Sequence, residues 1–123
     1  MGARGERIAL RYLRSRGMRL VARNLVLGAG EVDLLCRDRT GVLVVVEVKT
    51  REVDAQASGP PPEASITAAK RKKLLILAAD VARRSRVDAR SVRIDVVAVE
   101  LRSGARAVVR HHVRAVTAKT RRA

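Results

Sequence analysis

Residues 42–49 begin with a run of branched apolar side chains, Val42-Leu43-Val44-Val45-Val46, and continue as Glu47-Val48-Lys49. The apolar run does not alternate with polar residues, which is typical of a β-strand that is covered on both faces. Such a strand is expected in the middle of a sheet. Because side chains two residues apart on a strand point to the same face, Glu47 and Lys49 are predicted to lie side by side at its end.

The sequence on both sides of this strand predicts an α/β domain. Turn segments such as Gly28-Ala29-Gly30 separate further apolar runs, and two longer segments have helical periodicity. A loop rich in proline is expected over 51–63. The predicted helices cover 4–16 and 65–84, with Ser65 as the N-cap of the second, and the predicted strands cover 18–27, 31–37, 42–49, 91–101 and 107–113. The order α-β-β-β-α-β-β indicates a mixed sheet flanked by helices.

The chain is strongly basic. Its 123 residues include 27 Lys+Arg and 12 Asp+Glu, which gives a formal net charge of +15. This length fits a single domain, predicted over 1–114, followed by a basic tail over 115–123 that is expected to be disordered. So large a charge predicts a polyanionic partner, with nucleic acid as the first expectation and an anionic membrane surface as the second. The scarcity of aromatic residues, of which Tyr12 is the only one, counts against domains that stack bases on aromatic platforms.

Other features of the sequence indicate a cytoplasmic protein. No signal-peptide pattern is found at the N-terminus, and the longest apolar stretch, 74–79, is too short to span a bilayer. Bulky apolar anchors for a membrane surface are lacking too, so no membrane partner is expected. The single cysteine, Cys36, allows no internal disulfide and no cysteine-rich zinc site, and it is predicted to be an inert core residue.

Both predicted helices combine an apolar face with basic residues. On the first helix the arginines form one stripe, and Glu6 lies in the opposite, apolar arc. On the second helix Lys70 lies in the core stripe of Ile66, Leu74, Leu77 and Val81, where it is either a snorkelling side chain or a functional one. The residues predicted to bind nucleic acid are Arg4, Arg7, Arg11, Arg14, Arg71, Lys72 and Lys73.

The positions of the few acidic residues suggest a catalytic centre. Taken singly, Glu47 is explained by an ion pair with Lys49, and Asp33 by a turn cap. Glu6 also faces the core, and burying three carboxylates costs free energy unless a cation or another partner compensates their charge. Converging carboxylates beside one lysine form a site for a hard cation next to a group that activates water.

The same residues resemble a known signature. Gly30-Glu31-Val32-Asp33 followed by Val46-Glu47-Val48-Lys49 is similar to the Asp…Glu-x-Lys pattern of the restriction-endonuclease-like nucleases. The chain resembles most closely the YraN family of small bacterial proteins, whose relatives look like Holliday junction resolvases. The resemblance extends over nearly the whole chain and includes Gly5-Glu6, Ala9, Leu13, Gly17, Asn24, Ile66, Lys70 and Arg93-Ile94-Asp95-Val96-Val97.

This resemblance implies a restriction-endonuclease-like fold and a role for each site residue. Asp33, Glu47 and the backbone carbonyl of Val48 would hold Mg²⁺ or Mn²⁺. Lys49 would orient the attacking water, Glu6 would act as an accessory carboxylate, and Lys70 would reach the site from the second helix. The implied activity is cleavage of structured or branched DNA by phosphodiester hydrolysis, and the implied assembly is a homodimer.

Several alternatives remain at this stage. A nucleic-acid-binding protein without catalysis, either a degenerate nuclease or a ribosome-associated basic protein, also explains the charge. Asp95 is predicted to be structural, through backbone hydrogen bonds or a pair with Arg93. His111 and His112 are adjacent on a predicted strand and therefore point to opposite faces, which argues against a shared metal.

Overall fold

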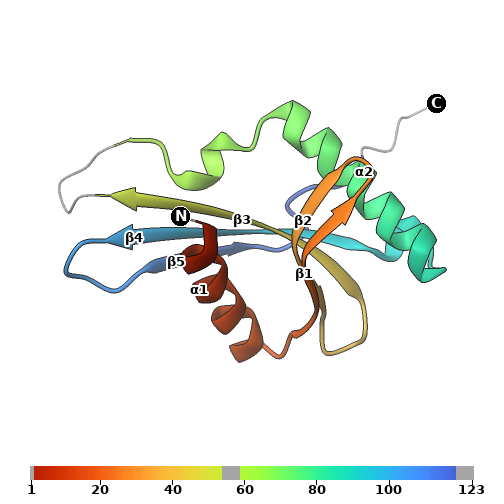
Figure 1. Cartoon of the computed structure of the whole chain (residues 1–123), viewed down its shortest axis with the longest axis horizontal. Coiled ribbons are helices and arrows are strands. Elements are labelled where there is room, and N and C mark those ends of the chain that lie inside the picture. The colour runs from red at the N-terminus through yellow and green to blue at the C-terminus, as the bar shows by residue number, and fades with distance from the viewer. Residues whose placement is uncertain (1, 54–58, 119–123) are drawn as a thin grey trace.

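The computed structural model describes residues 2–53 and 59–118, and within them one five-stranded sheet lies between two helices (Figure 1). The elements are α1 (Gly2–Ser15), β1 (Arg19–Leu27), β2 (Gly30–Arg37), β3 (Leu43–Val53), the 3₁₀ turn η1 (Pro62–Ser65), α2 (Ala68–Ser85), the 3₁₀ turn η2 (Ala89–Ser91), β4 (Arg93–Arg102) and β5 (Val108–His112). The predicted order α-β-β-β-α-β-β and the α/β class are confirmed.

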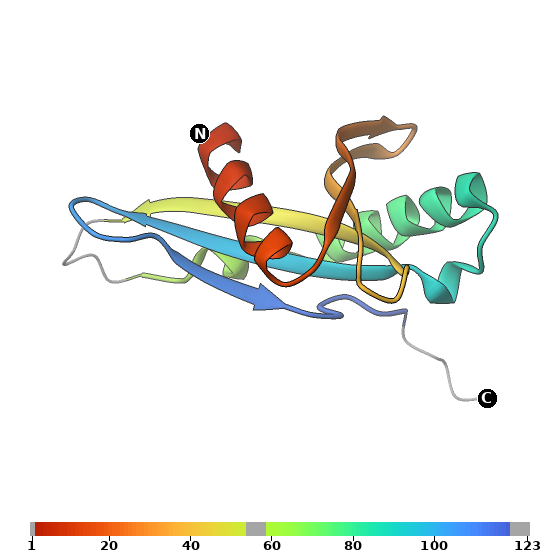
Figure 2. The same ribbon diagram turned by 90° about the horizontal axis from the view of Figure 1, so that it is seen from below.

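The strands lie in the order β1-β2-β3-β4-β5, so β3 is central, as its unbroken apolar run predicts. β3 pairs with β4 in parallel, and the other neighbouring pairs are antiparallel. The sheet is therefore mixed. The β1–β2 hairpin bends away from the plane of β3, β4 and β5 (Figure 2).

Each face of the sheet has its own apolar core. Val44 and Val46 pack with Leu10 and Leu13 of α1, whereas Val45 packs with residues of α2 that include Leu74, Leu77 and Val81. Alternate side chains of β3 thus serve opposite cores, and the strand has to be apolar on both faces. Cys36 is fully buried on the α1 face, where burial raises the pKa of its thiol to about 11.

Two glycines fix the position of α1. Gly17 follows the end of α1 with a φ of 89°, and its N–H donates to the carbonyl of Arg14 in the last turn of the helix. Gly5 is buried against β3, and a Cβ at this position would overlap the side chain of Thr50. A glycine next to Glu6 therefore allows the first turn of α1 to approach the central strand closely.

The segment between β3 and α2 differs from its prediction. β3 continues to Val53, and α2 begins after Thr67, whose side chain accepts a hydrogen bond from the N–H of Lys70. The prediction of Ser65 as N-cap is wrong because the Ser65 hydroxyl donates to the carbonyl of Pro62 within η1. Ile66 consequently precedes the helix and is only partly buried. Residues 54–58 of the predicted loop lie outside the described residues.

The packed body extends past the predicted domain boundary at residue 114. The N–H of Ala115 donates to the carbonyl of Ile94 at 2.9 Å, and Val116 is 6% exposed in the core beneath α2. The start of the predicted tail is thus part of the domain, and its residues 119–123 lie outside the described residues. Among the described helices, none has the length and apolar character needed to cross a membrane.

Candidate functional site

The sheet opens at Asp33. β2 pairs with β3 from Leu34 to Arg37, whereas its earlier residues pair with β1 alone. Where the two strands separate, β3 no longer has a backbone partner in β2. The Asp33 side chain supplies the acceptor instead, because its Oδ2 accepts the backbone N–H of Val48 at 2.8 Å. Asp33 is thereby held against the residue between Glu47 and Lys49.

Glu47 lies at the centre of the predicted site and is 4% exposed. Its Oε2 is 3.5 Å from the Nζ of Lys49 and 3.3 Å from the Nζ of Lys70. A buried carboxylate needs such partners, since burying a charge without compensation is costly. The structure therefore brings Glu47, Lys49 and Lys70 together as predicted, with Lys70 contributed by the first turn of α2.

The carboxylates influence one another electrostatically. Burial raises the pKa of Asp33 to about 7, and the charges of Glu47 and Glu6 act in the same direction against the Val48 hydrogen bond and Lys70. The pKa of Glu6 is also raised, first by burial and then by Glu31 and Glu47. A carboxyl group that is reluctant to ionise next to other carboxylates gains from a cation placed between them.

Glu6 approaches the cluster from α1. It lines a small hollow of about 140 Å³ with Arg23, Asn24 and Leu34. With its amide nitrogen turned toward the carboxylates, Asn24 donates to Glu6 at 3.2 Å and to Glu31 at 3.3 Å. Asn24 has a positive φ of 50°, which asparagine tolerates better than most residues. The resemblance included Asn24, but the sequence assigned it no role.

The donor set suits a magnesium-like ion. Among the described residues, no three His, Cys, Asp or Glu side chains gather closely enough to hold a metal by themselves. Mg²⁺, however, keeps several waters and is commonly bound through one or two carboxylates together with substrate phosphates. Asp33 and Glu47, joined through Val48, offer such a pair of hard oxygen ligands.

The predicted nucleic-acid-binding residues form two exposed surfaces. We call Arg4, Arg7, Arg11 and Arg14 the α1 stripe, and Arg71, Lys72 and Lys73 the α2 cluster. All seven side chains are exposed, and the two helices cover opposite faces of the sheet. Arg7 lines the hollow beside Glu6, and the Lys73 side chain lies beside Gly30 at the start of β2, so each surface has one member near the place where β2 leaves β3.

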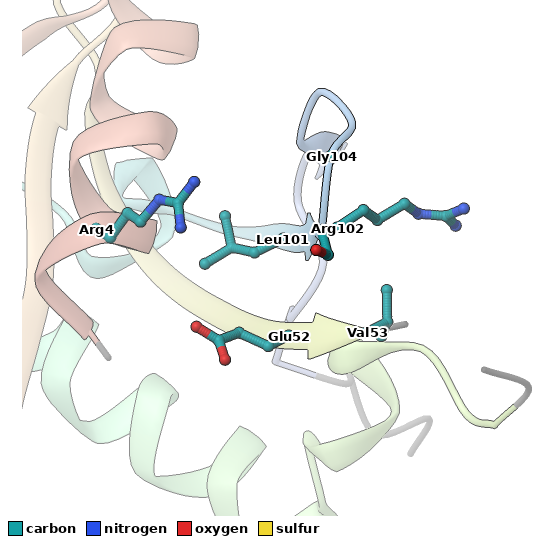
Figure 3. Close-up of a pocket in the computed structure, with 7 residues that line it drawn as sticks. Arg4, Glu52, Val53, Leu101, Arg102 and Gly104 are labelled. Carbon is teal, nitrogen blue, oxygen red and sulfur yellow. The ribbon is translucent and has the colours of Figure 1, made fainter. Parts of the chain in front are cut away.

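A larger hollow than the one beside Glu6 lies elsewhere in the molecule. It has a volume of about 580 Å³ and lies at the carboxyl ends of β3 and β4, beside Arg4, Glu52, Leu101 and Arg102 (Figure 3). None of the five predicted catalytic residues lines it. The clustered titratable side chains and the larger hollow thus lie in different places, and carboxyl groups with a shifted pKa are the better indication of a functional site.

Asp95 and the two histidines have structural partners. Fully buried Asp95 accepts hydrogen bonds from Arg93 at 2.9 and 3.0 Å, from the N–H of Arg114 at 3.1 Å, and contacts His111 Nε2 at 2.7 Å. The structural prediction for Asp95 is confirmed. His112 contacts Glu63 instead, so the two histidines do point to opposite faces.

Sequence reasoning missed an ion network that anchors η1. Arg110 Nε and Nη2 donate to the two oxygens of Glu63, both at 2.8 Å, and Nη2 also donates to Glu100 at 2.9 Å. These bonds hold the pKa of Glu63 at about 2. Because Glu63 and Arg110 are 47 residues apart, no local pattern pairs them.

Two solved structures are similar to this one over part of their length. An EndoMS-dsDNA2 complex matches with a TM-score of 0.48 and 20% identity, over 76% of this chain and 34% of that chain. SfsA of Pyrococcus furiosus in complex with Ca²⁺ matches with a TM-score of 0.41 and 16% identity, over 87% of this chain and 60% of that chain.

Curated relatives are much closer in sequence. UPF0102 proteins of Ralstonia pickettii and Solibacter usitatus are 41% and 45% identical, over 80% and 83% of this chain and 79% and 76% of theirs. A UPF0102 protein of Beutenbergia cavernae is 47% identical over 94% of both chains. The model of the Uncharacterised protein family UPF0102 matches residues 5–99, so the chain belongs to this family, which is the YraN family that the sequence resembles.

Proposed function

We propose that this protein is a divalent-metal-dependent nuclease that binds structured or branched DNA and hydrolyses its phosphodiester bonds. The observation that supports the proposal most is the meeting of Asp33, Glu47 and Lys49 where β2 leaves β3, with Lys70 closing the cluster from α2. Partly burying three polar side chains from two strands and a fourth from a helix in one place costs free energy. A shared function would explain why this protein carries that cost.

Each residue then has a chemical task. Asp33 and Glu47, with the carbonyl of Val48, are the groups that would hold the Mg²⁺ or Mn²⁺. When bound, such an ion neutralises a scissile phosphate and lowers the pKa of water. Lys49 orients the attacking water through its ammonium group, while Lys70 keeps Glu47 in place at 3.3 Å. Glu6, held by Asn24, is the accessory carboxylate.

The basic surfaces would position the substrate. The α1 stripe and the α2 cluster lie on opposite faces of the sheet, and each offers exposed cations to a phosphate backbone. A substrate with arms that diverge in space can contact both surfaces at once. This arrangement favours branched DNA, and a homodimer would present two such sites to two strands.

A non-catalytic nucleic-acid-binding protein is the second candidate, and one contact favours it. The two lysines beside Glu47 Oε2 already compensate its charge without any metal. In this alternative the cluster is a structural ion pair of the core.

A cleavage assay separates the two candidates. Purified protein is incubated with linear, flapped and four-way DNA in Mg²⁺, in Mn²⁺ and in EDTA. The nuclease proposal expects metal-dependent cuts in at least one branched substrate and none in EDTA. Binding without cleavage under every condition would establish the second candidate.

A further inference from the structure

A third hollow lies beside Tyr12, at the end of α1. It has a volume of about 440 Å³, and α1, the turn between β2 and β3, and β5 all contribute to its wall. Tyr12 is the chain's only aromatic residue and is half-buried here, packed against the core beneath α1. Since an α-helix rises about 1.5 Å per residue, Tyr12 lies about 9 Å along α1 from Glu6. One DNA molecule can therefore contact both this hollow and the proposed catalytic centre.

The Tyr12 ring lies between two neighbours. The guanidinium carbon of Arg16 lies over the ring, 5.0 Å from its centroid, and the His111 ring meets it nearly at right angles, with 5.5 Å between centroids. His111 is itself fixed by Asp95 at 2.7 Å. An arginine over an aromatic face is attracted by the electrons of the ring. Tyr12 thus keeps a planar cationic group at the wall of the hollow, and Arg16 is exposed there.

The charges around the hollow favour an anion. Three arginines line it, Arg16, Arg39 and Arg93, and the acid in its wall is Asp38. Asp38 is already engaged, because its Oδ2 accepts Arg93 Nη1 at 3.1 Å and its Oδ1 accepts the N–H and the hydroxyl of Thr40 at 2.9 and 2.6 Å. Asp38 and Arg93 therefore compensate each other, whereas Arg16 and Arg39 are exposed cations.

Gly17 explains why Arg39 reaches the hollow. A Cβ at Gly17 would overlap the Nε atom of Arg39, so the Arg39 side chain passes over the backbone directly after α1. Gly17 follows Arg16 in the sequence. A residue without a side chain at this point allows Arg39, from the turn between β2 and β3, to enter the hollow that Arg16 lines from α1.

These groups match an unpaired nucleotide. Its base is a flat ring that stacks on aromatic side chains and guanidinium planes, and its phosphate is an anion that arginine binds well. The bases inside a plain duplex have both faces covered by their neighbours and cannot enter. One tyrosine is too little for a platform that stacks several bases in a row, but it suffices for one base.

We propose that this hollow binds one unpaired nucleotide of DNA, with its base against the Arg16–Tyr12 pair and its phosphate at Arg39. The inference rests on the proposed function, because it takes DNA as the partner, and it adds a contact outside the carboxylate site. Flaps and bulges carry unpaired bases. The hollow would therefore make the protein prefer such DNA to a fully paired duplex.

The test compares a short duplex with the same duplex carrying one unpaired thymidine. Affinities are measured by fluorescence anisotropy in EDTA, so that no cleavage interferes. The parent should bind the bulged duplex roughly tenfold tighter, which corresponds to about 1.4 kcal/mol. Tyr12→Leu and Arg16→Gln should abolish this preference, and Tyr12→Phe should keep it. Arg16 is exposed, so Arg16→Gln tests the proposal even if Tyr12→Leu disturbs packing.

The emission of Tyr12 gives a direct second measurement. The chain has one tyrosine and no tryptophan, so its tyrosine fluorescence reports on this hollow alone. Saturation with the bulged duplex should quench the emission, and the paired duplex should leave it nearly unchanged, after correction for absorption with free tyrosine in the same DNA. Excess thymidine monophosphate should not displace the bulged duplex. Displacement would assign the hollow to free nucleotides instead.

The matched control is Arg14→Gln, because Arg14 is an exposed arginine of the same helix that does not line the hollow. It should weaken binding of both duplexes equally and keep the preference. The proposal is refuted if the parent binds both duplexes equally, if Arg16→Gln keeps the preference, or if the bulged duplex leaves the emission unchanged. These outcomes leave the proposed function intact, whereas absence of any DNA binding would remove both.

Discussion

At the scale of single residues, the site combines two different solutions for a buried carboxylate. Glu47 is compensated by two ammonium groups, at 3.5 and 3.3 Å, and needs nothing more to be stable. Asp33 accepts a hydrogen bond from the backbone N–H of Val48, and burial together with the nearby charges of Glu47 and Glu6 raises its pKa to about 7. The two residues should therefore respond in opposite ways when their charge is removed.

Asp33→Asn should change how stability depends on pH. The folded-state pKa is raised above the ordinary carboxyl value of about 4, so the folded protein retains a proton that the unfolded chain has already lost. The stability gained in this way is fully present below about pH 4 and is lost as pH rises to about 7. In the absence of metal, the free energy of unfolding of the Asp33→Asn protein should not fall over this pH range. At pH 8 this protein should therefore be more stable than the parent, by about 1–2 kcal/mol after allowance for solvent screening.

Urea unfolding at pH 5 and pH 8 in EDTA measures this effect. Glu52→Gln is the control, because Glu52 is an exposed carboxylate of the same strand as Glu47 and should follow the parent. Adding Mn²⁺ at pH 8 should raise the melting temperature of the parent and leave that of Asp33→Asn unchanged. If Mn²⁺ does not raise the melting temperature of the parent protein, the proposed metal site is wrong.

Glu47→Gln should destabilise the protein at neutral pH. The neutral amide leaves the ammonium groups of Lys49 and Lys70 close together without a carboxylate between them. Breaking a fully buried pair costs about 3–5 kcal/mol, but these lysines are 27% and 29% exposed, so about 2 kcal/mol is expected. Urea unfolding is again the measurement. A Glu47→Gln protein as stable as the parent would show that the two lysine contacts contribute little.

At the scale of elements, the site depends on how closely α1 and η1 are held to the sheet. Gly5 allows α1 to contact β3 beside Thr50, and Glu63 with Arg110 fixes η1 just before α2 begins. These two attachments determine where Glu6 and Lys70 enter the site.

Gly5→Ala should displace α1 from β3. The new methyl group would overlap the β-branched side chain of Thr50, which has little freedom to move away. Overpacking of this kind costs about 1–3 kcal/mol, and the melting temperature should fall accordingly. Thr50→Ala alone is the control and should be mild. If the double variant Gly5→Ala/Thr50→Ala does not recover part of the lost stability, the contact has been assigned wrongly.

The element scale also shows how far sequence reasoning extends. The non-alternating run at Val42–Val46 predicted a central strand, and the spacing of Glu47 and Lys49 predicted their contact; both are confirmed. The N-cap prediction failed because Ser65 and Thr67 are equally suitable caps locally, and η1 decides between them. The opening of the sheet at Asp33 depends on how three strands pair, which no local pattern contains.

At the scale of the whole molecule, the charge of +15 should dominate DNA binding. Each neutralised phosphate lowers log affinity by about 0.9 per log unit of salt. Because Val116 is packed in the core, a truncation should keep residues 1–118 and remove 119–123, which contain three cations. The salt slope should then fall by at most about 2.7, with an unchanged melting temperature. A slope near zero in the full chain would exclude nucleic acid as the partner.

The most direct test of the proposed nuclease activity compares cleavage with binding in Lys49→Ala. Single-turnover cleavage of a four-way junction is measured at saturating protein in Mn²⁺, alongside gel-shift affinity for the same junction. A lysine that orients the attacking water is needed for hydrolysis, so Lys49→Ala should abolish cleavage. The affinity for DNA should fall only slightly, because one phosphate contact among many is lost. Arg11→Ala, in the α1 stripe, should weaken binding and leave the cleavage rate of bound DNA unchanged. A Lys49→Ala protein that cuts as fast as the parent would contradict the account.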